Sequence, residues 1–96
     1  MSFLEFFLIL LFGCYPTHGY SMMPLIDFND CVVCLPASDY YVGDVVIYDN
    51  PWVKGDLIAH RIIYKENGLY VMKGDNETRM DAGVMTRDDI KCRVIV

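Results

Sequence analysis

Basic residues are scarce in this chain of 96 residues. Lys and Arg together number 8 against 13 Asp plus Glu, the net charge is -5, and no run of basic residues occurs. Proteins that bind nucleic acids neutralise phosphates with clustered Lys and Arg, so this composition argues against a nucleic-acid partner. The chain is also too short for a two-domain enzyme with a large cofactor-binding half. With 54% hydrophobic and 22% charged residues, we expect one small folded domain.

A long hydrophobic run is missing as well. The most apolar stretch, residues 3–12 (FLEFFLILLF), is much shorter than the roughly 20 residues of a spanning helix. Gly13 and Pro16 are expected to end any helix there, and no Lys or Arg precedes it as in a secretory signal peptide. We therefore interpret residues 1–15 as a short hydrophobic N-terminal helix, favouring contact with a membrane as a shortened anchor over packing against the domain. Residues 16–96 form the predicted domain.

Cysteine is present at only four positions, Cys14, Cys31, Cys34 and Cys92. Cys31 and Cys34 have the spacing of a C-x-x-C motif, but they lie in an apolar, β-branched segment that is typical of a strand. Residues three apart on a strand point to opposite faces, so these thiols should not share a partner or a metal. No second pair completes a zinc site. We expect buried, unpaired thiols, with a disulfide or a metal site as the alternatives.

Short apolar stretches alternate with turn signals from residue 19 onward. We expect five strands, over residues 31–36, 40–48, 57–64, 69–73 and 90–96. Gly43-Asp44 should bend the second strand, Asn67-Gly68 should form a hairpin turn, and Asp88-Asp89 should begin a helix or turn. The predicted class is mainly β, as a small barrel or folded sheet.

Two residues suggest nucleophilic chemistry. Ser21 follows Gly19-Tyr20 and precedes Met22-Met23-Pro24, a setting that permits a sharp turn and an exposed hydroxyl. Alternation along a predicted strand places His60 on the same face as Ile58 and Ile62. The resulting partial burial would keep it a neutral proton acceptor for a serine. The simpler interpretations are a turn serine and a histidine bonded to the backbone.

Two carboxylates enclose the loop that follows the fourth predicted strand. Asp75 and Asp81 could each orient a histidine and stabilise its charged form. Their simpler role is to bind the N–H groups of the turn. The residues alone do not choose between the two aspartates.

Together and in this order, five segments resemble type I signal peptidases of the archaeal and endoplasmic-reticulum type. These segments are residues 19–24 (GYSMMP), like the nucleophile box; residues 41–48 (YVGDVVIY), like the Val-Gly-Asp-x-Val strand; residues 59–63 (AHRII), like the His-Arg box; residues 73–76 (KGDN) with Asp81, like the Lys-Gly-Asp-Asn box; and residues 90–96, like the closing strand. The resemblance covers residues 19–96.

The resemblance implies a serine endopeptidase with a mostly β catalytic core. It implies that Ser21 is the nucleophile, His60 the general base, Asp81 the catalytic aspartate and Asp75 a supporting aspartate. The implied reaction removes signal peptides from preproteins after small residues, at the extracytoplasmic or lumenal side of a membrane. No metal or organic cofactor is implied.

The chain departs from this family in several places. Gly19 stands where family members often carry a hydroxyl that assists the oxyanion, Cys92 replaces a glycine, and the hydrophobic segment is short. A minimal copy of this kind could require an accessory subunit. One alternative is a weak or inactive membrane-associated module that binds preproteins. The other is a self-cleaving repressor-type serine peptidase, which His60 in place of a lysine base and the acidic charge disfavour.

Overall fold

The structure is a computed structural model that describes residues 3–4, 15–16, 21–23, 25–26 and 31–95. Its strands are β1 (Tyr15–Pro16), β2 (Cys31–Val32), β3 (Cys34–Leu35), β4 (Val45–Asp49), β5 (Leu57–Glu66), β6 (Leu69–Lys73), β7 (Met85–Thr86) and β8 (Ile90–Val94), and a 3-10 turn, η1, spans Arg87–Asp89. The predicted mainly β class is confirmed. The predicted N-terminal helix lies almost entirely outside the described residues. None of the helical segments in the described part of the chain is long and apolar enough to span a membrane.

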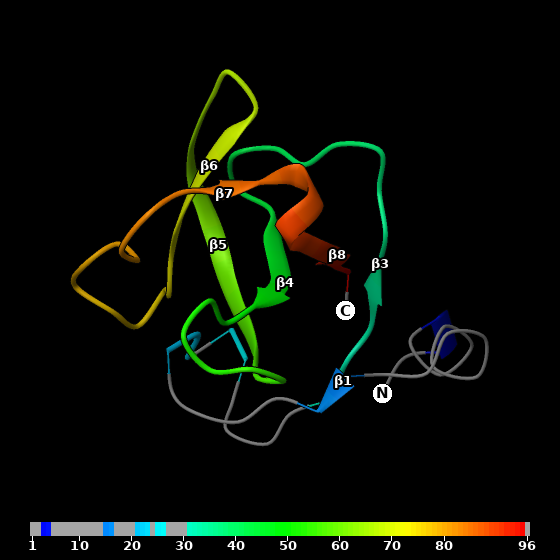
Figure 1. Ribbon diagram of the computed structural model, residues 1–96. Helices are drawn as coiled ribbons and strands as arrows, with labels where there is room; N and C mark the ends of the chain where they lie inside the picture. Colours follow the sequence, from blue (N-terminus) through cyan, green and yellow to red (C-terminus); the bar gives the residue numbers. More distant parts are fainter. Residues whose placement is uncertain (1–2, 5–14, 17–20, 24, 27–30, 96) are drawn as a thin grey trace.

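Six strands form one antiparallel sheet in the order β3-β8-β4-β5-β6-β7, and β1 pairs with β2 separately (Figure 1). The outer strands of the sheet are β3 and β7. Within the described residues no pairing between these two strands closes the sheet, so an open sheet is observed rather than a barrel. The strands β4 and β5 lie in the middle of this order, where they are paired on both sides.

Both faces of β4 are buried, because its side chains alternate between two apolar clusters. Val46 and Tyr48 belong to a cluster that we call the tyrosine core; Val45 and Ile47 belong to one that we call the disulfide core. The tyrosine core consists of Tyr40, Val46, Tyr48, Ile62, Tyr70, Met72, Met85 and Ile90. The disulfide core consists of Met22, Ile26, Val32, Cys34, Val45, Ile47 and Cys92.

The predicted strands are largely confirmed, with four differences. The first predicted strand is interrupted at Val33, and the second begins only at Val45, because Gly43 has φ +100° and Asp44 N–H bonds Tyr41 O in a turn. The two-residue strands β1 and β7 were not predicted, because two residues carry no periodicity. Tyr15 of β1 was instead expected to end the N-terminal helix. The hairpin turn at Asn67-Gly68 and the turn at Asp88-Asp89 are present as predicted.

The prediction of unpaired thiols is wrong. Cys34 and Cys92 form a disulfide with a Cα–Cα distance of 5.4 Å, and Cys31 is also disulfide-bonded. On paired strands, residues offset by two positions lie diagonally opposite on one face. Cys34 pairs in register with Val94, which places Cys92 at this diagonal position. Strand pairing therefore joins cysteines that are 58 positions apart in the sequence.

Candidate active site

Ser21 is held beside β5 by its neighbour Met22 and by the turn after β6. The next residue, Met22, is 4% exposed and is part of the disulfide core. Asn76 N–H donates to Ser21 O at 2.6 Å, so the turn after β6 fixes the serine backbone. This close approach requires Gly74, since a Cβ on that residue would lie 2.7 Å from Ser21 O.

His60 is positioned by its register on β5. It lies opposite Val46 of β4, and the residue is 7% exposed, the only buried polar or charged residue among those described. Its Nε2 lies 3.1 Å from Ser21 Oγ. This distance allows the hydroxyl to donate its proton to the ring, as a serine nucleophile requires.

Asp81 binds the other nitrogen of the same ring. Its backbone N–H donates to Met72 O at 2.8 Å, which ties the loop after β6 back to the sheet. Its Oδ2 lies 2.7 Å from His60 Nδ1. An ionised carboxylate only accepts hydrogen bonds, so Nδ1 carries the proton and Nε2 is left as the acceptor that faces Ser21.

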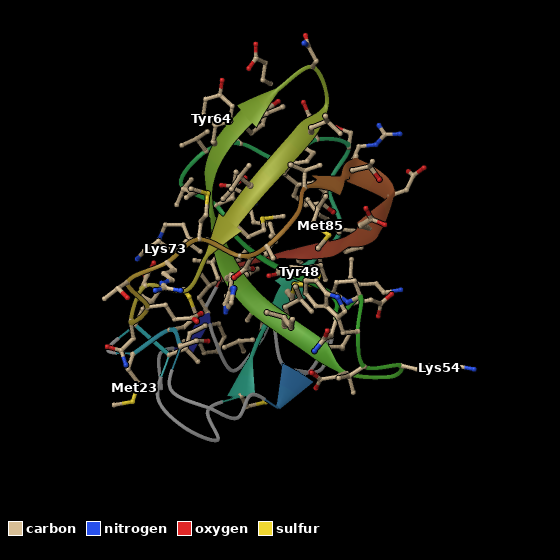
Figure 2. The ribbon with its side chains drawn as sticks, turned by 60° about the vertical axis from the view of Figure 1, so that its left-hand side comes forward. Met23, Tyr48, Lys54, Tyr64, Lys73 and Met85 are labelled. Carbon is tan, nitrogen blue, oxygen red and sulfur yellow. A yellow bond between two sulfur atoms is a disulfide. The ribbon has the colours of Figure 1, made fainter. Side chains whose placement is uncertain are left out.

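Tyr48 completes this side of the site from within the tyrosine core. It is 1% exposed, and its hydroxyl donates to Asp81 Oδ2 and lies 3.1 Å from His60 Nδ1. Figure 2 shows Tyr48 in the middle of the molecule with Met85 above it. Tyr48 therefore holds the carboxylate that holds the histidine.

Burial and hydrogen bonding act in opposite directions on Asp81. Burial raises its pKa, but the hydrogen bonds from His60 and Tyr48 outweigh burial and leave the pKa below its usual value. Burial and the neighbouring Asp81 raise the pKa of Tyr48, so this hydroxyl stays protonated and remains a donor. Both directions favour an ionised Asp81 beside His60.

Asp75, the second predicted aspartate, does not bind His60. Its carboxylate accepts two hydrogen bonds from Arg61, at 2.9 and 2.8 Å, and this pairing lowers its pKa. Arg61 also donates to Gly43 O at 2.7 Å. The arginine thus joins the Val-Gly-Asp turn, strand β5 and the Lys-Gly-Asp-Asn turn, and Asp75 supports the site through it.

Glu77 lies on the serine side of the histidine. Its Oε1 is 3.0 Å from His60 Nε2, and its side chain is 42% exposed. His60, Glu77 and Asp81 could each offer one ligand atom to a metal ion, with these atoms within 4.8 Å of one another. Among the described residues, this is the group of His, Cys, Asp and Glu side chains that lie close enough together to share a metal ion.

Sequence reasoning missed Tyr48, Glu77 and the role of Arg61. Alternation along residues 45–48 places Tyr48 on the face of Val46, and Val46 is the neighbour of His60 in register. That signal could have identified Tyr48 once the pairing was known. Glu77 follows Asn76 in the matched box, but nothing in the sequence indicates that its side chain turns back to His60.

A partly open, mainly apolar cavity of about 210 Å³ borders Tyr48 and Asp81. It is lined by Tyr48, Asn50, Pro51, Trp52, Ile58, Asp81, Ala82 and Met85.

Comparison with known proteins identifies no relative of this chain. No protein-family model matches it. No curated protein matches it, and no solved structure does.

Proposed function

We propose that this protein is a serine endopeptidase similar to type I signal peptidases, which removes N-terminal signal peptides from preproteins. One observation carries the proposal: Ser21 Oγ, His60 and Asp81 Oδ2 form a continuous hydrogen-bonded row, at 3.1 and 2.7 Å. They come from three segments far apart in the sequence. A nucleophile, a base and an orienting carboxylate in this order are the groups that acyl transfer needs.

The proposed reaction proceeds in two steps. Ser21 Oγ attacks the carbonyl carbon of the scissile peptide while His60 Nε2 accepts its proton, and Asp81 stabilises the resulting imidazolium. His60 then gives this proton to the departing amine as the C–N bond breaks, leaving an ester on Ser21. A water molecule, deprotonated by His60, attacks the ester and restores the serine hydroxyl. We expect the backbone N–H of Ser21 to donate to the oxyanion.

The proposed substrate class rests on the resemblance together with the convergence of the matched segments. The nucleophile box, the His-Arg box and the Lys-Gly-Asp-Asn box meet at His60 through the contacts of Ser21, Asn76 and Asp81. The Val-Gly-Asp box joins them through the bond from Arg61 to Gly43 O. Segments that each resemble the same family thus build one site. This convergence supports the substrate class that the resemblance implies, preproteins with small residues before the cleavage point.

We further propose that the protein associates with a membrane and cleaves on its extracytoplasmic or lumenal side. The Cys34–Cys92 disulfide supports this location, because disulfides persist in oxidising compartments. The proposed membrane contact is the apolar segment at residues 1–15, most of which lies outside the described residues. An accessory subunit that presents the substrate remains part of the proposal.

Cleavage of a preprotein with an Ala-x-Ala signal peptide tests the function. The detergent-solubilised parent should cleave it, whereas Ser21→Ala and His60→Ala should each lower kcat by about 10,000-fold or more. The matched control is Ser38→Ala, at an exposed serine that lies outside the site and should cleave like the parent. Cleavage that survives Ser21→Ala would refute the assigned nucleophile. A folded parent that binds the preprotein but never cleaves it would favour a binding module.

A further inference from the structure

The contact between His60 and Glu77 places two proton acceptors against each other. Asp81 takes the Nδ1 proton, so in the neutral ring Nε2 presents a lone pair. Glu77 Oε1, a carboxylate oxygen that also accepts only, lies 3.0 Å from this nitrogen. Such a contact is attractive only when a positive charge lies between the two atoms. The cation is either a proton on Nε2 or a metal ion.

We propose that Zn²⁺ binds between His60 Nε2 and Glu77 Oε1, with Ser21 Oγ as a third ligand, and inhibits the enzyme. Imidazole nitrogen with carboxylate oxygen is a donor set that suits Zn²⁺ and not Mg²⁺, which prefers oxygen ligands alone. The binding half of this proposal stands on the geometry alone. The inhibitory half rests on the proposed peptidase function.

The two distances from His60 Nε2 to the other proposed ligands fit a zinc site with small adjustments. Tetrahedral zinc ligands at their usual bond lengths lie about 3.3 Å from one another. Nε2 is 3.0 Å from Glu77 Oε1 and 3.1 Å from Ser21 Oγ. Glu77 can move the few tenths of an ångström required, because its side chain is 42% exposed. Three protein ligands leave a fourth position for water.

Asp81 supplies the second feature of a zinc site. Histidines that bind zinc commonly donate their other N–H to a carboxylate, which orients the ring and strengthens it as a ligand. The bond between His60 Nδ1 and Asp81 Oδ2, at 2.7 Å, has this arrangement. Arg61 is already paired with Asp75, so it does not neutralise Asp81 or Glu77. Asp81 and Glu77 each place a carboxylate oxygen at a ring nitrogen of His60, and this negative charge favours a divalent cation.

Inhibition follows because the zinc ion and the Ser21 proton compete for the same lone pair on His60 Nε2. A zinc ion on Nε2 occupies the electron pair that must accept the Ser21 proton. His60 can then neither accept the serine proton nor pass it to the departing amine, so the proposed reaction stops. Removal of the metal by a chelator restores the acceptor, so the inhibition is reversible.

Calorimetric titration tests the binding half without any turnover. Metal-free parent should bind one Zn²⁺ and no Mg²⁺, Glu77→Gln should bind Zn²⁺ at least about tenfold more weakly, and His60→Ala should lose the site. Glu66→Gln is the matched control, because it makes the same chemical change at a different place. Glu66 is an exposed residue at the end of β5, and its carboxylate binds Tyr64. Equal affinity in the parent and Glu77→Gln would overturn the site. An absence of Zn²⁺ binding would also overturn it and leave a proton as the cation.

Cleavage assays test the inhibitory half. Zn²⁺ should stop preprotein cleavage by the parent, and a chelator should restore it. Each variant is compared with its own metal-free rate, and Glu77→Gln should need at least about tenfold more Zn²⁺ for the same fractional inhibition. Binding without inhibition would overturn this half. If the metal-free parent cleaves nothing, the peptidase proposal and the inhibitory half fail together, while calorimetry still decides the metal site.

Discussion

Four side-chain oxygens surround the two ring nitrogens of His60, and they fall into two pairs. Asp81 and Tyr48 lie at Nδ1, whereas Ser21 and Glu77 lie at Nε2. The Nδ1 pair is buried or half-buried and fixes the tautomer of the ring. The Nε2 pair includes Glu77, whose side chain is 42% exposed, and the proposed function requires the substrate to approach on this side. The chemistry of the site therefore depends on which oxygen occupies Nε2.

The two aspartates should differ sharply in their importance for catalysis. Asp81→Asn should lower kcat by about 10,000-fold, because an amide no longer selects the tautomer in which Nε2 accepts a proton. Asp75→Asn removes a partner of Arg61 and should cost far less. Steady-state cleavage of the same preprotein by both variants measures this difference. Equal losses would contradict the separate roles that their contacts indicate.

Tyr48→Phe should make the protein more sensitive to acid. Ionised Asp81 stabilises the fold above its usual pKa, and this contribution is lost as the pH falls through its lowered folded-state value. Without the Tyr48 hydroxyl that pKa rises, so acid unfolding should begin at a higher pH. Stability at neutral pH should fall by about 1–3 kcal/mol, since a partly buried carboxylate loses a donor.

Acid titrations followed by far-ultraviolet circular dichroism measure the Tyr48→Phe effect. Tyr64→Phe is the matched control, because this tyrosine is exposed and lies well away from Tyr48 along the β5–β6 hairpin (Figure 2). It should unfold in acid like the parent. An unchanged acid transition in Tyr48→Phe would show that its hydroxyl does not hold Asp81 in the ionised state.

At the residue scale, the sequence predicts candidates better than contacts. Ser21, His60 and the two aspartates can be selected by residue type, turn context and order, and the structure brings Ser21, His60 and Asp81 into contact. Tyr48 and Glu77 could not be selected in this way. The first depends on the register of β4 against β5, and the second on the path of a loop, and neither leaves a periodic signal in the sequence.

At the scale of elements, the turn after β6 positions Ser21, the proposed nucleophile. Gly74→Ala should lower kcat/KM by about 100-fold, because its Cβ would lie 2.7 Å from Ser21 O and 2.9 Å from Ser21 Cβ and would displace the serine. The fold should persist, since the strands do not change. Cleavage kinetics beside circular dichroism measure the two effects separately.

Gly68→Ala is the matched control for this glycine. Gly68 has φ +75° and no atom within 4 Å of its would-be Cβ, so alanine there should cost about 1–2 kcal/mol of stability through backbone strain. Cleavage by the folded protein should not change. Full activity in Gly74→Ala would show that the contact between the turn and Ser21 does not position the nucleophile.

The elements themselves were largely readable from the sequence, for a physical reason. Strands such as β5 and β6 run for five residues or more and leave a pattern of apolar residues, and the Asn67-Gly68 turn has residues that tolerate positive φ. The strand β7 is too short to leave such a pattern. The break at Val33 depends on a change of partner, from β1 to β8, which only the whole sheet defines.

At the scale of the whole molecule, the two cores meet at β4 and connect the site to the rest of the fold. Tyr48 reaches the site from the tyrosine core, and Met22 anchors the residue next to Ser21 in the disulfide core. The alternation of apolar residues along a strand predicts which of its faces is buried. It does not predict which distant segments share a core. The Cys34–Cys92 bond was not predicted for the same reason, because it depends on the pairing of β3 with β8.

The disulfide should supply a large share of the stability of this small domain. It joins residues 58 positions apart, a separation for which loop-closure entropy corresponds to about 4 kcal/mol. The double variant Cys34→Ala/Cys92→Ala should therefore unfold in urea with its free energy of unfolding lowered by about that amount. Because Cys34 and Met22 share the disulfide core, cleavage should be lost at the same urea concentration as the fold. An unchanged unfolding midpoint would show that strand pairing and packing hold β3 and β8 together without the disulfide.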